Sequence, residues 1–266
     1  MKKILIAGSN GLVGRALAKY LKSKGYMVYT ASRTNADFSI DLSDYLQYEK
    51  TFSDISFDVV VCTAVSYSDL LPDALQNVSI STNIFTYFQD KTQQRLFVSS
   101  FSALEENKHQ SPYNFTKYLA DKTIEMYDAH ACVLRFGQII DIKEGSRKAQ
   151  RGFHYFVDAI NENQSINVFT KHDAKRTYIS VQNVCEAIEF AIINDIRGFH
   201  NIVIHPLLTL QELLKLLLDA KQDGYSGEIN LIDKESISYH IPSSSEKFDS
   251  FVKDKSMELY LKQFIK

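Results

Sequence analysis

The stretch that most constrains this chain is a glycine-spaced segment directly after its first apolar run. Ile4–Ala7 is short, branched and apolar, and GSNGLVGRAL follows it with Gly8, Gly11 and Gly14 three residues apart. A helical apolar pattern begins inside this segment and is closed by Gly25. A strand, a glycine turn and a helix in this order open a doubly wound α/β fold. An ordinary tight turn would have the same letters, so the rest of the chain must decide what the glycines are for.

Strand and helix patterns alternate along the first half of the chain. Short runs rich in branched apolar residues predict strands at Ile4–Ala7, Met27–Ala31, Asp58–Thr63, Arg95–Ser99 and Cys132–Phe136. Helical patterns fill the gaps, from Leu12 to Leu21 and around 43–51, 71–90 and 113–128. Strands that are apolar on both faces need helices on both sides. We therefore predict an α/β fold of the Rossmann type, with a doubly wound parallel sheet.

The chain changes character after about residue 140. Two helical patterns remain, Val181–Ile193 and Thr209–Asp219, but the strand patterns at Asn167–Phe169 and His200–Ile204 are short and the loops are polar. We predict a dinucleotide-binding domain over 1–140 and a smaller C-terminal α/β substrate-binding lobe over 141–266. The helix at 181–194 is expected to pack back on the first domain.

Charge and cysteine usage narrow the class of protein. A formal net charge of −2 over 266 residues gives no general field that attracts nucleic acid or an acidic membrane. The three cysteines, Cys62, Cys132 and Cys185, lie in apolar runs and are typical of buried, reduced thiols. Metal-ligand spacings and apolar runs of about 18 residues are both absent from the sequence. We expect a cytoplasmic protein that binds no nucleic acid, membrane or metal.

The glycine segment lies where the phosphates of a dinucleotide would bind. In a doubly wound sheet, the turn after the first strand directs helix N-terminal amides above the sheet edge. The first glycine allows the tight turn, the second lets the backbone approach a pyrophosphate, and the third lets helix and strand pack closely. The spacing here is G-x-x-G-x-x-G rather than G-x-G-x-x-G. The residues expected to contact the cofactor in this turn are Gly8, Asn10, Gly11, Leu12, Val13 and Gly14.

The end of the second strand bears on the choice between NADP and NAD. It carries Ser32 and Arg33 where an acid would bind the ribose of NAD. An arginine can pair with a 2′-phosphate and a serine adds a hydrogen bond, so NADP is favoured and NAD is the alternative. A solvated surface arginine would look the same. Asp41, followed by Leu42, is placed to accept from the adenine amino group, or else to cap the next helix.

A tyrosine and a lysine four residues apart supply candidate acid–base chemistry. Ser111 is a plausible N-cap with Pro112 after it, so Tyr113 and Lys117 fall on one face of a new helix. A tyrosine with its ordinary pKa of about 10 is a poor acid–base group at neutral pH, and an adjacent ammonium favours the phenolate. The pattern is weak by itself, because it also occurs at Tyr20/Lys24, Tyr87/Lys91 and Tyr118/Lys122. We favour Tyr113/Lys117 because this pair alone follows a serine-tipped strand at a helix start.

Together these motifs resemble the extended short-chain dehydrogenases/reductases that modify nucleotide sugars. YNFTKYLAD, from Tyr113, is similar to the family pattern Y-x-x-S-K-x-x-x-E. The resemblance implies a catalytic set of Ser100, Tyr113 and Lys117. It adds Ala64, Val65, Asn83, Ser99 and Phe136 to the cofactor-binding residues, and it implies substrate binding by Gln138 and Arg176.

The resemblance implies a function with alternatives. Phe101 and Ser102 stand where 4,6-dehydratases have an acidic pair, which argues against dehydration. The loop from Ser100 to Tyr113 is shorter than is usual in the family, so Ser102 is a competing catalytic hydroxyl. Our leading hypothesis is an NADP-dependent reductase of a nucleoside-diphosphate 4-keto-sugar, with a role in polysaccharide biosynthesis. The first alternative is an NAD-dependent nucleotide-sugar 4-epimerase, and the second is a non-catalytic NAD(P)-binding sensor. A homodimer is left open.

Overall fold

The computed structural model describes residues 1–128, 130–142, 150–171, 174–235, 239–253 and 255–266. The chain forms two compact units. The first contains Met1–Phe136 and Val181–Asn201, and the second contains Gly137–Ser180 and Ile202–Lys266. Each unit is described by itself below.

The first unit is built on a seven-stranded sheet. Its strands are β1 (Lys3–Ala7), β2 (Met27–Ser32), β3 (Phe38–Ser39), β4 (Val59–Cys62), β5 (Gln94–Ser100), β6 (Cys132–Phe136) and β10 (Gly198–Ile202). They lie in the order β10-β6-β5-β4-β1-β2-β3, and the neighbours from β6 to β3 pair in parallel. This arrangement confirms the predicted α/β fold. The strand order reverses between β1 and β4, which is where open α/β sheets bind ligands, beyond the carboxyl ends of the strands.

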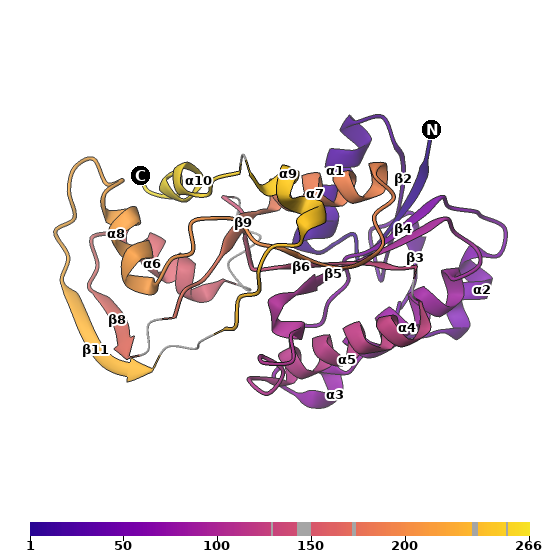
Figure 1. The fold of residues 1–266 in the computed structure, drawn as a ribbon, viewed down its shortest axis with the longest axis horizontal. Helices are drawn as coiled ribbons and strands as arrows, with labels where there is room; N and C mark the ends of the chain where they lie inside the picture. The colour runs from indigo at the N-terminus through magenta and orange to yellow at the C-terminus, as the bar shows by residue number, and fades with distance from the viewer. Residues whose placement is uncertain (129, 143–149, 172–173, 236–238, 254) are drawn as a thin grey trace. The chain divides into compact units, whose positions relative to one another are not determined.

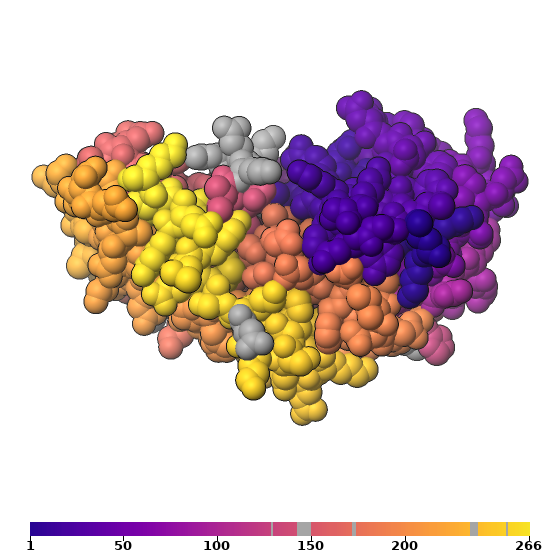
Figure 2. Space-filling view, turned by 90° about the horizontal axis from the view of Figure 1, so that it is seen from above, coloured from indigo at the N-terminus to yellow at the C-terminus, as the bar shows by residue number. Residues whose placement is uncertain are grey.

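Helices cover both faces of this sheet. They are α1 (Leu12–Ser23), α2 (Leu46–Phe52), α3 (Leu71–Ala74), α4 (Gln76–Phe88), η1 (Phe101–Ala103), α5 (Pro112–Tyr127) and α7 (Val181–Ile193). Helices α1 and α7 share one face, and α4 and α5 share the other (Figure 1). The Tyr20 hydroxyl of α1 donates to Glu189 of α7 at 2.5 Å. In Figure 2 the orange atoms of α7 correspondingly border the indigo atoms of the N-terminal segment.

The predicted helix over 71–90 is in fact two helices, α3 and α4. The amide of Val78 donates to the carbonyl of Leu75, only three residues back, at 3.0 Å. This tighter bond interrupts the four-residue spacing of an α-helix and marks the change of helix at Leu75. The second helix, α4, starts one residue before Asn77, whose side chain is important below.

The core of the first unit follows from the apolar strands. Val59–Cys62 is buried along its whole length, as expected of a strand covered on both faces. Leu17 and Leu21, one turn apart on α1, are fully buried against the sheet side of that helix. The three cysteines are free and buried, as predicted.

Strand β10 corrects one sequence-based assignment. We assigned the strand pattern at His200–Ile204 to the C-terminal lobe, whereas β10 lies next to β6 at the end of the main sheet. The amide of Gly198 donates to the carbonyl of Ala131 at 2.8 Å, just before β6 begins. The pairing partner is therefore about 67 residues away by sequence position, and local pattern does not reveal it.

The second unit contains two small parallel sheets and its own helices. Its strands pair as β7 (Gln138–Ile140) with β9 (Tyr178–Ser180) and β8 (Ile166–Lys171) with β11 (Ile229–Glu235). Its helices are α6 (Arg151–Asn161), α8 (Leu210–Leu218), η3 (Glu246–Phe248), α9 (Asp249–Val252) and α10 (Glu258–Lys262). None of the helices that the structure describes, in either unit, has the length and apolar character needed to span a bilayer.

Candidate active site

The glycine segment forms a tight turn that presses against the turn after β4. Gly8 has φ +87°, and a Cβ there would lie 2.4 Å from the amide nitrogen of Ala64. A Cβ on Gly14 would lie 2.3 Å from the carbonyl oxygen of Gly8. The hydroxyl of Thr63 ties the two turns together by donating to the carbonyls of Ala7 and Gly8, at 3.0 and 3.2 Å. Only glycine fits at positions 8 and 14, and both lie at the switch point of the sheet.

The middle glycine is different, because a Cβ there would not clash. A Cβ on Gly11 would meet only the Gly8 carbonyl, at an ordinary 3.4 Å. Gly11 is the N-cap of α1, and among the described residues no side chain caps this helix. The amides of Leu12, Val13 and Gly14 fall in its first turn, where N–H groups have no acceptor within the helix. An uncapped helix start below an open glycine fits the pyrophosphate of a dinucleotide.

The loop after β2 is held close to this turn. The side-chain amide of Asn10 donates to the carbonyl of Thr34 at 2.5 Å. The hydroxyl of Ser39 donates to the carbonyl of Arg33 at 2.8 Å, which fixes the backbone of that arginine. Arg33 is exposed, and Ser32 before it is half-buried. The cationic side chain predicted to recognise a 2′-phosphate is therefore available at the end of β2.

Asp41 already has local partners. Its carboxylate accepts from the amide and the hydroxyl of Ser43, at 2.9 and 2.7 Å. These hydrogen bonds, and to a smaller extent the charge of Arg33, lower the pKa of Asp41. The carbonyl of Leu42 accepts from the side chain of Asn83 at 3.2 Å and from the hydroxyl of Tyr48 at 2.8 Å. Asn83 thus ties α4 to this loop, and adenine contacts of Asp41 and Leu42 stay predictions.

Sequence reasoning missed Asn77, on the first turn of α4. Its side chain accepts from the amide of Ser66 at 2.8 Å and donates to the carbonyl of the same residue at 3.0 Å. It also lies 3.1 Å from the hydroxyl of Thr116 on α5. Ala64 and Val65, just before Ser66, follow β4, so Asn77 fixes the segment expected to line the cofactor site. The signal available in the sequence was a polar residue inside a helical apolar pattern. In the structure Asn77 is 3% exposed, and a polar group so buried needs hydrogen-bond partners.

The two serines at the end of β5 have different surroundings. The hydroxyl of Ser99 is buried and donates to Asp121 at 2.7 Å. The hydroxyl of Ser100 caps η1 by accepting from the amide of Ser102 at 3.2 Å, and Ser100 is half-buried. Successive strand residues point to opposite faces, which explains the difference. Ser100 keeps its own hydroxyl hydrogen as a donor, as the proposed catalytic role requires.

The helix that carries Tyr113 begins as predicted. Ser111 is the N-cap of α5, and its hydroxyl accepts from the amide of Asn114 at 3.1 Å. Pro112 occupies the first helical position, so Tyr113 lies in the first turn and is half-buried. Lys117, one turn later, is 2% exposed. Its ammonium donates to the carbonyl of Val98 on β5 at 3.2 Å and lies 4.0 Å from the ring centroid of Phe97.

Burial and charge act on Lys117 in opposite directions. Loss of solvation lowers the pKa of its ammonium, while the negative charge of Asp121 raises it, and the net effect is a pKa below the usual 10.5. Burial likewise raises the pKa of the Cys62 thiol to about 11. The lysine therefore lies inside the protein with its charge poorly solvated, directly behind the helix start that carries Tyr113.

The other three Tyr-x-x-x-Lys matches form a matched comparison. In each of them the ammonium lies over the ring of its own tyrosine, at 5.2 Å for Tyr20, 3.6 Å for Tyr87 and 5.9 Å for Tyr118. These are ordinary cation–π contacts between neighbours on one helix face. Lys117 instead turns into the sheet. The structure thus separates Tyr113/Lys117 from its competitors by geometry as well as by position.

A second tyrosine that the sequence did not single out contacts Tyr113. Tyr67 lies between β4 and α3, and its ring stacks on that of Tyr113 with centroids 5.0 Å apart and an interplanar angle of 25°. Tyr67 is largely exposed. Loss of solvation nevertheless raises the pKa of Tyr67, and an interaction with the Tyr113 side chain opposes the increase.

A buried charge network lies beneath this helix. Asp121 accepts from the guanidinium of Arg135 on β6 at 2.7 Å, in addition to its bond with Ser99. Burial raises the pKa of Asp121, whereas Arg135, Lys117 and the Ser99 hydrogen bond lower it. Phe136, which follows Arg135, is fully buried. The role predicted for Phe136 at the nicotinamide stays a prediction.

The predicted substrate residues belong to the second unit. Arg176 is 9% exposed, its backbone bridges to Leu208, and its guanidinium donates to the carbonyl of Ala174 at 2.7 Å. Its charge also acts on the hydroxyl of Tyr239. Gln138 is half-buried at the start of β7, and its amide donates to the carbonyl of Thr177 at 2.9 Å. Gln138 thus lies beside Thr177, the residue that follows Arg176.

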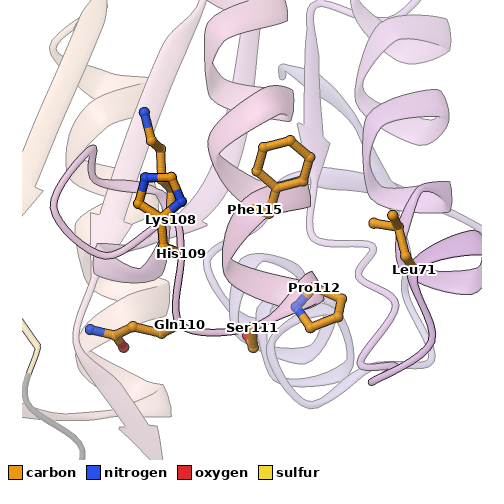
Figure 3. Close-up of a pocket in the computed structure, with 7 residues that line it drawn as sticks. All are labelled: Leu71, Lys108, His109, Gln110, Ser111, Pro112 and Phe115. Atoms are coloured by element: carbon orange, nitrogen blue, oxygen red, sulfur yellow. The ribbon is translucent and has the colours of Figure 1, made fainter.

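A hollow of about 410 Å³ lies beside the start of α5. It is lined by the loop 108–111, by Pro112 and Phe115 of α5, and by Leu71 of α3 (Figure 3). Phe115 is two residues after Tyr113 and therefore points to another side of the helix. We do not assign this hollow to the active site. Within the part of the chain that the structure describes, His, Cys, Asp and Glu side chains form no group of three or more suited to a metal ion.

The chain is similar to a family model and to several solved structures. A family model described as the NAD dependent epimerase/dehydratase family matches residues 4–204. The curated protein sequences compared with this chain contain no match. Among solved structures, UDP-N-acetylglucosamine 4-epimerase from Bacillus cereus is similar, with a TM-score of 0.78, 16% identity, and coverage of 99% of this chain and 98% of that chain.

Two further solved structures from Bacillus anthracis are similar as well. A dTDP-4-dehydrorhamnose reductase in complex with NADP has a TM-score of 0.79 and 13% identity, and covers 99% of this chain and 98% of that chain. A dTDP-glucose 4,6-dehydratase in complex with NAD has a TM-score of 0.79 and 15% identity, and covers 99% of this chain and 95% of that chain. At such identities the structures show a shared fold. The family model covers most of the sequence, and the protein therefore belongs to the NAD dependent epimerase/dehydratase family.

Proposed function

We propose that this protein is an NADP-dependent reductase of a nucleoside-diphosphate 4-keto-sugar. The observation that carries the proposal is the Tyr113/Lys117 pair, in which a buried ammonium lies one turn from a half-buried tyrosine at the start of α5. The glycine turn at the switch point of the same sheet fits the pyrophosphate of a nicotinamide dinucleotide. When bound, NADPH supplies the hydride for the keto carbon.

Each of the three catalytic residues has a separate task. Tyr113 gives its proton to the substrate oxygen. Lys117 favours the resulting phenolate because its charge is buried and weakly screened. Ser100 donates its hydroxyl hydrogen to the carbonyl oxygen and orients it, since its own oxygen is already engaged by the amide of Ser102.

The choice of NADP rests on Arg33. Its side chain is exposed, its backbone is held by Ser39, and the preceding Ser32 offers a hydroxyl. An arginine pairs well with a phosphate because its guanidinium presents several fixed donors. We further propose that Gln138 and Arg176 bind the sugar nucleotide, with Arg176 on the diphosphate. Two similar structures are named as complexes, one with NADP and one with NAD.

One observation favours a second candidate, an NAD-dependent nucleotide-sugar 4-epimerase. The carboxylate of Asp41 is close enough to Arg33 for the two charges to interact. A negative charge there partly neutralises the arginine and weakens its attraction for a 2′-phosphate. The epimerase would use the same Ser100, Tyr113 and Lys117.

Stoichiometry separates the two candidates. The purified protein is incubated with dTDP-4-dehydrorhamnose and with UDP-N-acetylglucosamine, the compounds named for two similar structures. A reductase consumes one NADPH for each keto-sugar that disappears, and it releases NADP. An epimerase interconverts two sugars without net consumption of added cofactor. Binding of NADPH with no turnover of any nucleotide sugar tested would instead support a sensor and overturn both enzymatic proposals.

A further inference from the structure

Tyr67 lies outside every motif that the sequence analysis used, yet it contacts the proposed proton donor. Its ring stacks on that of Tyr113, with 5.0 Å between the ring centroids. Both residues belong to the first unit, so the contact is independent of the second unit. The side chain of Tyr67 is 66% exposed, so burial in a core does not explain why an aromatic residue stands here.

We infer that Tyr67 is a positioning residue for Tyr113, holding its hydroxyl in place and donating a hydrogen bond to the phenolate that forms during reduction. This inference rests on the proposed function. In the reaction the O–H bond of Tyr113 breaks and a new O–H bond forms on the substrate oxygen. Tyr67 keeps its own proton throughout and directs its O–H group at the phenolate oxygen.

The chemistry of a phenol suits this task. A hydroxyl both donates and accepts, so the contact persists when Tyr113 changes from neutral donor to anion. A hydrogen bond from a neutral donor to an anion is stronger than one between neutral groups, and it favours the charged form. Lys117 supplies charge from inside the protein, where its ammonium bonds to Val98. Tyr67 adds a directed donor at the hydroxyl itself.

The position of Tyr67 is fixed through the backbone of Ser66, the residue before it. The side chain of Asn77 bonds both the amide and the carbonyl of Ser66, the residue directly before Tyr67. The same side chain reaches Thr116 on α5, and the hydroxyl of Thr116 donates to the carbonyl of Tyr113 at 3.1 Å. Consecutive hydrogen bonds thereby connect the backbone of Ser66 to the backbone of Tyr113. A loop held in this way keeps its side chain in a defined orientation.

The test compares Tyr67→Phe, which keeps the stacked ring, with Tyr67→Leu, which removes it. Tyr127→Phe is the control, because Tyr127 is an exposed tyrosine at the other end of α5. We expect Tyr67→Phe to lower kcat at neutral pH by about 5- to 10-fold, the worth of one hydrogen bond. NADPH affinity should not change. The alkaline limb of the kcat profile should move to higher pH, because Tyr113 holds its proton longer without the donor. Tyr67→Leu should lower kcat more than Tyr67→Phe does, and Tyr127→Phe should leave kcat unchanged.

A second measurement keeps this inference separate from the proposed reaction. Phenolate formation at Tyr113 is followed by near-ultraviolet absorbance, as the difference between each protein and its Tyr113→Phe derivative. Titration of Tyr113 at higher pH in Tyr67→Phe than in wild type supports the inference, even if no sugar is turned over. Identical titration of Tyr113 in the two backgrounds overturns it, whatever the activity. If the wild-type protein turns over no sugar nucleotide, only the proposed function is overturned.

Discussion

The hydroxyl of Ser99 donates to the carboxylate of Asp121 across 2.7 Å, inside the protein. Ser99 belongs to β5 and Asp121 to α5, so this bond fixes the rotation of the helix on the sheet. Arg135 of β6 bonds the same carboxylate, which adds a second fixed point. Tyr113 and Lys117 stand two turns and one turn before Asp121 on the same face. The network therefore fixes which face of α5 carries the proposed acid–base pair. Ser99 and Asp121 are buried, and Arg135 is partly exposed.

The lowered pKa of Lys117 predicts a pH dependence of stability. Between its folded pKa and its usual 10.5, the unfolded chain binds a proton that the folded protein has released. The unfolded state then binds more protons, so the free energy of unfolding of wild type rises with pH in this window. We expect wild type to gain stability relative to Lys117→Met as pH increases toward 10.5, as measured by urea unfolding at several pH values. Lys19→Met, an exposed site on α1, is the control. If the stability of wild type relative to Lys117→Met fell as pH increased, the lowered pKa of Lys117 would be contradicted.

Cofactor preference is the second prediction, and it involves Arg33 and Asp41 together. Arg33→Ala should reduce the preference for NADPH over NADH by roughly 10- to 100-fold, because a charge-assisted pair with the 2′-phosphate is lost. Asp41→Asn should increase that preference, because the negative charge that acts on Arg33 disappears. Dissociation constants for both cofactors, measured by calorimetry, decide the point. Equal affinities for NADPH and NADH in wild type would refute the role of Arg33.

Much of this architecture is readable from the sequence, and the exceptions have physical causes. The fold class, the family and the prediction of an NAD(P)-dependent enzyme are confirmed, because apolar runs and helix caps are local features. The sheet that β10 joins depends on residues far away in the sequence, and our sequence-based assignment of this strand to the C-terminal lobe was wrong. Ser99 and Ser100 look alike as letters, but strand alternation sends the hydroxyl of Ser99 to Asp121.

The site shows the same division between local and non-local information. Asn83 and Asn77 share a helical pattern, and only tertiary structure reveals that Asn77 holds the loop after β4. Tyr67 lies in a loop, where no periodicity indicates what a side chain contacts. The functional roles of Ser100, Tyr113 and Lys117 stay predictions.

The glycine turn offers a prediction that separates folding from cofactor binding. Gly14→Ala puts a Cβ 2.3 Å from the Gly8 carbonyl, so we expect a lower thermal midpoint even without cofactor. Gly11→Ala has room for the methyl and loses only a favourable N-cap residue, so its midpoint should fall less than that of Gly14→Ala. Its affinity for NADPH should nevertheless fall by roughly 10-fold, because the new methyl stands where the pyrophosphate approaches. Gly152→Ala, in open space on α6, is the control. Unchanged NADPH binding by Gly11→Ala would place the phosphates elsewhere.

The fourth prediction concerns substrate binding by Arg176. If its guanidinium holds the diphosphate of the sugar nucleotide, Arg176→Ala should raise KM by roughly 10-fold or more, since a charge-assisted pair is lost. The dissociation constant for NADPH should stay the same. Arg151→Ala removes an exposed arginine from the same unit and should leave KM unaltered. If Arg176→Ala weakened NADPH binding and spared KM, the residue would belong to the cofactor site.

The last prediction concerns the proton donor. Tyr113→Phe removes only a hydroxyl from a half-buried ring, so the fold and the affinity for NADPH should be retained. Turnover should fall by ~10²–10⁴, the usual range for losing a positioned acid or base. Stopped-flow measurement of NADPH oxidation with a confirmed sugar nucleotide gives the rate of the chemical step.

Two competing tyrosines provide the controls for this prediction. Tyr118→Phe and Tyr87→Phe alter matches in which the lysine lies over the tyrosine ring, and both variants should keep nearly full activity. Tyr118 stands five residues after Tyr113, which turns it well away from the face that carries Lys117. Loss of activity in Tyr118→Phe with full activity in Tyr113→Phe would mean that another face of α5 meets the substrate. If all three variants turned over a confirmed substrate at the wild-type rate, no tyrosine of these pairs would be the acid, and the glycine turn would hold a cofactor for different chemistry.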